Sequence, residues 1–139
     1  MIVDSFVDTN VLIYAAAGLH DAPAKHARAW DIIGPANYGI SGQVLAEFYV
    51  NVIKKPSIPL TVSEAAKWVE SLKLMPVVAI DGDLVSEAIA YSKRYQISYW
   101  DAGLVAAANR LEAPILYTED LSHGQKYGSV TAINPFRSN

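Results

Sequence analysis

The sequence has no cysteine, which excludes disulfide bonds, zinc–thiolate sites and cysteine nucleophiles. It also has no apolar run close to the roughly 18 residues that a membrane-spanning helix needs. Its first residues lack the basic segment, apolar segment and cleavage site of a signal peptide. We therefore expect no membrane span and no signal peptide, and a cysteine-free chain suits the reducing cytoplasm.

Positive charge is scarce as well. The chain has 11 Lys and Arg residues against 14 Asp and Glu residues, a net charge of −3. This balance argues against broad, salt-driven binding to nucleic acid, because the phosphates attract basic surfaces. It leaves room for a narrow nucleic-acid site in which a bound metal ion reverses the local charge.

The length and hydrophobic content of the chain predict one folded domain over residues 1–139. The 139 residues are 52% hydrophobic and 18% charged, which excludes a disordered chain. We predict N-caps for three helices at Thr61 or Ser63, at Asp83 and at Ser98. The alternation of strands and helices predicts an α/β fold with a parallel sheet and helices on both faces. The predicted strands are 3–7, 38–41, 75–80, 113–118 and 128–133, and the predicted helices are 10–16, 22–33, 42–53, 62–73, about 83–95 and 98–112.

Acidic side chains follow three of the predicted strands at the point where each strand ends. The segments are 8–10 (Asp-Thr-Asn), 81–83 (Asp-Gly-Asp) and 118–120 (Thr-Glu-Asp). The carboxyl ends of parallel strands meet at one edge of a sheet, which is where ligands bind in open α/β sheets. We therefore expect several of these carboxyl groups to lie close together.

Asp101 lies in the first turn of helix 98–112, on the side of the helix that carries Leu104, Val105 and Ala108. A buried carboxylate without a partner is costly. One explanation is a capping box with Ser98, although Glu or Gln is the usual partner there. The other explanation is that Asp101 faces inward to bind a metal ion.

Each of the other acids also has a structural explanation. Asp8 suits a helix N-cap, Asp120 suits a turn, and Glu47 borders the apolar stripe of its helix. Three or four carboxylates at one place would nevertheless repel unless a cation neutralises them. Oxygen ligands without Cys or His favour Mg²⁺ or Mn²⁺, and such an ion can activate water for an in-line displacement at phosphorus.

Four segments of the sequence resemble the motifs of the PIN domain family: "FVDTNVLIYA" (6–15), "GQVLAEFYV" (42–50), "SYWDAGLVAAA" (98–108) and "LYTEDLSHGQ" (116–125). A small single-domain chain of this kind is most similar to the VapC-type toxins of toxin–antitoxin pairs. The resemblance implies a three-layer α/β/α sandwich with a five-stranded parallel sheet. It also implies Mg²⁺- or Mn²⁺-dependent cleavage of RNA, a homodimer, and inhibition by a small cognate antitoxin.

The resemblance further implies roles for individual residues. Asp8, Glu47 and Asp101 match the core metal ligands, and Asp120 matches the fourth acid, although Glu119 beside it competes for that role. Three polar residues match positions that orient acids or water: Thr9, Asn10 and Thr118.

Three residues outside these motif acids are candidate substrate contacts. Lys54 and Lys55 suit RNA phosphates, but cations are also favourable at a helix C-terminus. His123 suits a phosphate contact or a proton shuttle, and it equally suits an ordinary surface loop.

Two other functions remain open at this point. The segment "VVAIDGDLV" (77–85) resembles the nucleophile motif of haloacid-dehalogenase-type phosphatases, with Asp81 as nucleophile and Asp83 as acid/base. That motif opens its domain, and too few residues follow Val85 for the rest of a doubly wound core. A PIN fold that binds RNA or protein without turnover is the other alternative, and its expected mark is the loss of an acid, whereas all four are present.

Overall fold

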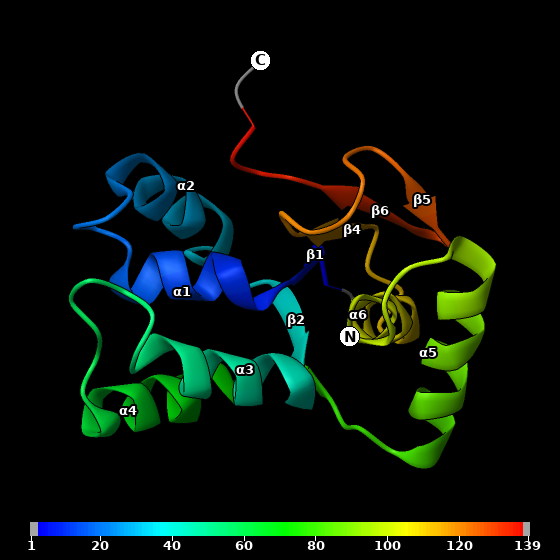
Figure 1. Ribbon diagram of the computed structural model, residues 1–139, viewed down its shortest axis with the longest axis horizontal. Helices are drawn as coiled ribbons and strands as arrows, with labels where there is room; N and C mark the ends of the chain where they lie inside the picture. Colours follow the sequence, from blue (N-terminus) through cyan, green and yellow to red (C-terminus); the bar gives the residue numbers. More distant parts are fainter. Residues whose placement is uncertain (1–2, 138–139) are drawn as a thin grey trace.

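The computed structural model describes residues 3–137, and this part of the chain forms six helices and six strands (Figure 1). The strands alternate with helices as predicted, so the α/β class is confirmed. None of the helices within 3–137 has the length and apolar character needed to cross a bilayer. The elements are β1 (Ser5–Val7), α1 (Thr9–Ala17), α2 (Pro23–Ile33), β2 (Tyr38–Ser41), α3 (Gly42–Val52), α4 (Val62–Leu72), β3 (Val77–Val78), α5 (Gly82–Tyr95), α6 (Tyr99–Arg110), β4 (Ile115–Tyr117), β5 (Lys126–Tyr127) and β6 (Val130–Ile133).

The strands form one sheet in the order β3-β2-β1-β4-β6-β5. The first five strands in this order are parallel to one another, as expected. The sixth, β5, is antiparallel to β6, so the expected strand count is one short. A two-residue turn joins these strands, and Gly128 in it has a φ of 64°, where glycine is favoured. The sequence pattern missed β5 because a strand of two residues has no detectable apolar period.

The sheet lies between two layers of helices. Helices α1 to α4 cover one face and α5 and α6 cover the other (Figure 1). The strand order reverses beside β1, because β2 and β3 lie on one side of this strand and β4 and β6 lie on the other. Ligands of open α/β sheets bind beside such a reversal, outside the carboxyl ends of the strands. The ends of β1 and β4 are therefore where a site is expected.

The core is built from the sheet and from α6. Phe6 and Leu116, on the two central strands, are fully buried. In α6, every residue from Ala102 to Ala108 is buried. The apolar side of this helix is therefore wider than the predicted stripe. Asp101 stands immediately before the buried run and is half-buried.

The helix starts confirm two predicted caps and correct a third. Ser98 caps α6 as predicted, and Thr61 rather than Ser63 caps α4, in a capping box with Glu64. Helix α5 is capped by Asp81, whose carboxylate accepts a 2.8 Å hydrogen bond from the Leu84 amide. The prediction that Asp83 is the cap is therefore wrong, since the helix begins one residue before Asp83 and places it in the first turn.

Candidate active site

Asp8 directly follows β1 and caps α1, so its carboxylate lies at the carboxyl edge of the sheet. Its Oδ1 accepts a 2.6 Å hydrogen bond from the Thr9 amide. Its Oδ2 accepts a 2.7 Å bond from the Thr118 hydroxyl and a 3.3 Å bond from the Asn10 amide nitrogen. Asp8 is only 4% exposed. The N-cap role is therefore present, but the Thr118 bond, which reaches across from β4, goes beyond capping.

Burial raises the pKa of Asp8 from 3.8 to about 7. The hydrogen bonds from Thr118 and Thr9 lower this pKa, and the negative charges of Asp120 and Glu47 raise it further. Loss of solvation is the larger effect because water cannot reach the carboxylate. At neutral pH the charged form of Asp8 is thus held at a free-energy cost that a nearby cation would remove.

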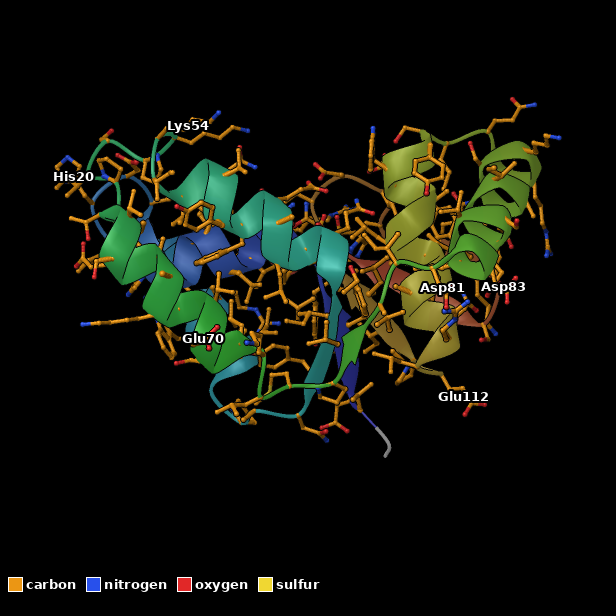
Figure 2. The ribbon with its side chains drawn as sticks, turned by 90° about the horizontal axis from the view of Figure 1, so that it is seen from below. His20, Lys54, Glu70, Asp81, Asp83 and Glu112 are labelled. Atoms are coloured by element: carbon orange, nitrogen blue, oxygen red, sulfur yellow. The ribbon has the colours of Figure 1, made fainter. Side chains whose placement is uncertain are left out.

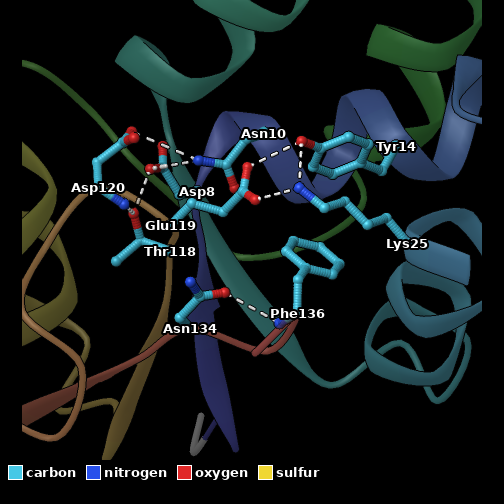
Figure 3. Close-up of polar contacts among 9 residues, drawn as sticks. All are labelled: Asp8, Asn10, Tyr14, Lys25, Thr118, Glu119, Asp120, Asn134 and Phe136. Atoms are coloured by element: carbon cyan, nitrogen blue, oxygen red, sulfur yellow. Dashed lines mark hydrogen bonds and ion pairs between the residues drawn. The ribbon is translucent and has the colours of Figure 1, made fainter. Parts of the chain in front are cut away.

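Asp120 is tied to Asp8 through Thr118 and Asn10 (Figure 3). The Asp120 amide donates a 3.0 Å hydrogen bond to the Thr118 hydroxyl oxygen, which itself donates to Asp8. The Asn10 side-chain nitrogen donates to Oδ2 of Asp120 at 3.4 Å as well as to Asp8. Residues from the ends of β1 and β4 therefore form one connected polar cluster.

Glu119 points the other way (Figure 3). Its Oε2 lies 2.7 Å from Lys25 Nζ, and its Oε1 accepts a 3.0 Å hydrogen bond from the Tyr14 hydroxyl. Of the two neighbouring acids, Asp120 faces Asp8 and Glu119 faces Lys25. Lys25 was not singled out from the sequence, since it lies on α2 outside the four motifs, whereas Tyr14 lies on α1 within the motif 6–15.

Glu47 approaches the cluster from α3, and its charge raises the pKa of Asp8. Its Oε1 accepts a 2.8 Å hydrogen bond from the side-chain nitrogen of Gln43, one turn earlier. The same nitrogen lies 3.1 Å from the carbonyl oxygen of Trp100, at the start of α6. Gln43 therefore fixes Glu47 relative to α6. Sequence reasoning missed it, although its four-residue spacing from Glu47 was visible.

Asp101 lies at the start of α6, near Asp120. Its amide donates a 3.1 Å hydrogen bond to Ser98 Oγ. Within residues 3–137 the Asp101 carboxylate makes no reciprocal bond to the Ser98 amide, so only half of a capping box is formed. Partial burial raises the pKa of Asp101, the Ser98 side chain lowers it, and the charge of Asp120 raises it. Capping thus accounts for the Asp101 amide but not for the position of its carboxylate.

The remaining candidates lie farther from this cluster. Lys54 and Lys55 are exposed beyond the end of α3, and Lys54 lies beside His20 at one end of the molecule (Figure 2). Asp81 and Asp83 lie at the opposite end in the same view, where the Asp81 carboxylate pairs with Arg110 at 3.3 Å. Neither pair contributes to the cluster around Asp8.

His123 is exposed in the loop between β4 and β5. Its Nδ1 accepts a 3.0 Å hydrogen bond from the Asn134 amide, which follows β6. His123 therefore lies at the same carboxyl edge of the sheet as Thr118, one strand farther along. The bond at Nδ1 leaves Nε2 as the nitrogen that is open to a ligand.

The spacing of the acids and the oxygen atoms around Asp8 decide what kind of metal ion this site would fit. Among residues 3–137, no three Asp, Glu, His or Cys side chains are grouped closely enough to form a cage around a metal ion. Two buried oxygens beside Asp8, Thr9 Oγ1 and Asn10 Oδ1, have no hydrogen-bond partner within the part of the chain that the structure describes. Mg²⁺ retains several waters and binds proteins through one or two carboxylates, and amide oxygens are ligands of hard cations. The oxygen-only donor set fits such a hydrated ion and does not fit a dehydrated one.

The fold has counterparts among solved structures. A toxin–antitoxin complex from Klebsiella pneumoniae matches with a TM-score of 0.69 at 18% identity, over 96% of this chain and 99% of that one. VapC20 of Mycobacterium tuberculosis, a toxin that cleaves the sarcin–ricin loop, matches with a TM-score of 0.65 at 19% identity, over 84% and 89%. VapBC2 from Rickettsia felis, bound to a promoter DNA fragment, matches with a TM-score of 0.63 at 17% identity, over 95% and 97%. The TM-scores show that these proteins share the fold of this chain, and at such low identities they show no more than the fold.

Comparison at the level of families is more specific. No curated protein sequence matches the chain. The PIN domain family matches residues 5–127, which include β1, α6, β4 and all four acids of the motifs. The resemblance seen in the sequence is therefore confirmed, and this chain belongs to the PIN domain family.

Proposed function

We propose that the protein is a metal-dependent endoribonuclease and the toxin of a VapBC-type toxin–antitoxin pair. The observation that carries the proposal is the environment of Asp8, a buried carboxyl group with a pKa of about 7 whose neighbours Asp120 and Glu47 are also acids. A protein without a ligand for this place would gain stability by replacing one of these acids. The PIN family membership and the toxin structures of the same fold support this assignment.

Asp8, Glu47, Asp101 and Asp120 would hold a hydrated Mg²⁺ or Mn²⁺ ion, in part through its water molecules, and this ion when bound activates water and stabilises charge developing on the scissile phosphate. The other residues act on these acids. Thr118 and Thr9 orient the Asp8 carboxylate, Asn10 bridges it to Asp120, and Gln43 orients Glu47.

The substrate we propose is RNA, with contacts spread along the acidic edge. His123 lies at this edge, with Nε2 open to a phosphate of the RNA. Lys54 and Lys55 follow the end of the helix that carries Glu47, so they would contact phosphates flanking the scissile one. The two lysines therefore affect RNA affinity more than the chemical step.

We further propose that the protein acts in the cytoplasm, as a homodimer, and is held inactive by a small antitoxin. Exposed apolar side chains lie beside Glu47, as expected for a surface that another chain covers. Val50, Ile80 and Trp100 line a pocket of about 330 Å³ that also includes Glu47. Trp100 is 64% exposed. A partner placed there would cover the acids and block access of RNA.

The test uses purified protein freed from any antitoxin. It should cut RNA in Mg²⁺ or Mn²⁺, stop when EDTA is added, and resume when the metal ion is restored. Asp8→Asn should be inactive while remaining folded. Cleavage that persists in chelator and does not respond to metal would refute the mechanism.

The alternative is a PIN fold that binds RNA or protein without cleaving it. The open spacing of the acids, without a compact group of three among residues 3–137, favours this alternative. The same assay separates the two functions, since a binding protein retains RNA in Mg²⁺ and leaves it intact. The phosphatase alternative loses its support, because the Asp81 carboxylate is engaged by the Leu84 amide and by Arg110.

A further inference from the structure

Residues from three other segments of the chain contact the Lys25 ammonium group (Figure 3). Lys25 Nζ lies 2.7 Å from Glu119 Oε2 and donates a 3.1 Å hydrogen bond to the Tyr14 hydroxyl. It also lies 4.9 Å from the centroid of the Tyr14 ring and 5.6 Å from that of Phe136, whose ring packs edge-on against Tyr14. Lys25 is therefore held by two polar groups and by two aromatic faces, which attract a cation.

Glu119 is fully engaged by this cluster. One carboxylate oxygen pairs with Lys25 and the other accepts from the Tyr14 hydroxyl. The side chain of Glu119 is 24% exposed, and that of Lys25 is 39% exposed, so the pair is partly shielded from solvent. The contact neutralises Glu119 at a position directly beside Asp120.

The direction of Glu119 decides which acid faces Asp8. The two residues are consecutive in the turn after β4, and their side chains leave this turn on opposite sides (Figure 3). If Lys25 were replaced, Glu119 would lose the cation that lies 2.7 Å from its carboxylate. Rotation of the turn would then bring a fifth carboxylate toward the other acids, in competition with Asp120.

We propose that Lys25 is a positioning residue, which with Tyr14 holds Glu119 away from the acidic cluster so that Asp120 alone faces Asp8 from this turn. This inference rests on the proposed function, in which Asp120 binds the metal ion. Lys25 acts here through Glu119 and not on the RNA, because its ammonium group is occupied by Glu119, Tyr14 and the two rings.

The experiment compares Lys25→Met, Glu119→Gln and the double variant with the wild type. In Lys25→Met we expect RNA cleavage to fall by about 10–100-fold in kcat, the range for residues that orient metal ligands. The KM for RNA should stay unchanged. Mg²⁺ should stabilise Lys25→Met more than it stabilises the wild type, because the released Glu119 adds negative charge. Thermal melting over a range of Mg²⁺ concentrations, without RNA, measures this directly.

The double variant provides the decisive comparison. Removing the released charge with Glu119→Gln should restore cleavage in the Lys25→Met background, and the Mg²⁺ response should return to that of the wild type. Lys25→Arg keeps the ion pair and should behave like the wild type. If Lys25 instead binds RNA phosphate, Lys25→Met raises KM, Glu119→Gln does not rescue it, and the inference is wrong.

Two further outcomes also overturn the inference. If Lys25 only supports packing, Lys25→Met lowers the melting temperature while kcat and the Mg²⁺ response stay as in the wild type. If the wild type cleaves RNA and Lys25→Met cleaves it equally well, the proposed function stands and the inference fails. If the wild type does not cleave RNA, the proposed function fails, and the Mg²⁺ melting series alone decides the role of Lys25.

Discussion

Thr118 and Asp8 are 110 residues apart in the chain, and the Thr118 hydroxyl donates a 2.7 Å hydrogen bond to Asp8 Oδ2. The register of β1 and β4 pairs Val7 with Tyr117. Asp8 and Thr118 directly follow these two residues, so the same register brings their side chains together. Thr118 is fully buried, so water cannot replace its hydroxyl. The position of the Asp8 carboxylate is thus set by the pairing of two central strands.

Replacing Thr118 by valine tests this bond at nearly constant volume. A hydrogen bond to a charged group contributes about 1.5–3 kcal/mol, so Thr118→Val should lower the free energy of unfolding by that amount at pH 8. The Asp120 amide also loses its acceptor. Urea denaturation measures the change. Thr131→Val, on β6 and half-buried, is the control and should cost no more than about 0.5 kcal/mol; equal losses in both variants would contradict the role of the bond.

The stability of the metal-free protein should fall as the pH rises from about 4 to about 7. The folded pKa of Asp8 is about 7, above its ordinary value of 3.8, so in this window the folded state binds the proton that the unfolded state has released. The stabilising contribution of protonated Asp8 is therefore complete below the window, and its loss across the window is at most about 4 kcal/mol. Asp101, whose pKa is also raised, contributes with the same sign.

The control for this pH dependence is Asp8→Asn, which has no charge to lose. Chemical denaturation in EDTA at several pH values should show a much flatter profile for this variant and a higher stability than the wild type at pH 8. Added Mg²⁺ should flatten the profile of the wild type as well, because it stabilises the ionised carboxylate. An unchanged slope in Asp8→Asn would show that another group causes it.

The edge of the sheet that carries the acids could be predicted from the sequence. Asp8 and Thr118 directly follow strands, and the ends of parallel strands meet at one edge whatever the details of packing. The choice between Glu119 and Asp120 could not be predicted. Consecutive residues in a turn have no periodicity that assigns them to a side, and the contact that separates them comes from Lys25, 94 residues earlier in the chain.

The N-cap of α5 and the role of Gln43 could not be predicted from the sequence either, and the reasons are equally local. Asp81 and Asp83 both suit an N-cap, and the choice depends on where helical backbone angles begin, which side-chain types do not specify. Gln43 carries no charge, and although it lies in the motif 42–50 with Glu47, the resemblance assigns it no role. Its importance depends on the close approach of α3 and α6, which is a property of the packed structure.

Asp101→Asn separates the two explanations of this acid. If Asp101 binds a metal ion, the metal-free variant should be at least as stable as the wild type at pH 8, since a half-buried charge is removed. Stabilisation by Mg²⁺ should shrink, and RNA cleavage should fall by about 100-fold or more. Ser98→Ala is the matched control: it should lose about 1 kcal/mol with the cap and keep the Mg²⁺ response. A less stable but fully active Asp101→Asn would show that the acid serves only the helix start.

The absence of a side chain at Gly103 lets Gln43 approach α6 closely. Adding a methyl group there, in Gly103→Ala, should therefore disturb Gln43. A Cβ at Gly103 would lie 2.6 Å from Gln43 Oε1, at the flexible end of that side chain. Gly103→Ala should therefore displace the Gln43 amide from Glu47 and lower RNA cleavage by about tenfold. Its unfolding free energy should change little, because the helix gains about 1 kcal/mol from alanine and the displaced contact offsets it.

In a Gln43→Ala background the clash is absent, so Gly103→Ala should stabilise the protein by about 1 kcal/mol without a further loss of cleavage. Additive effects in this double-mutant cycle, measured by urea denaturation and RNA cleavage, would show that Gly103 and Gln43 act independently.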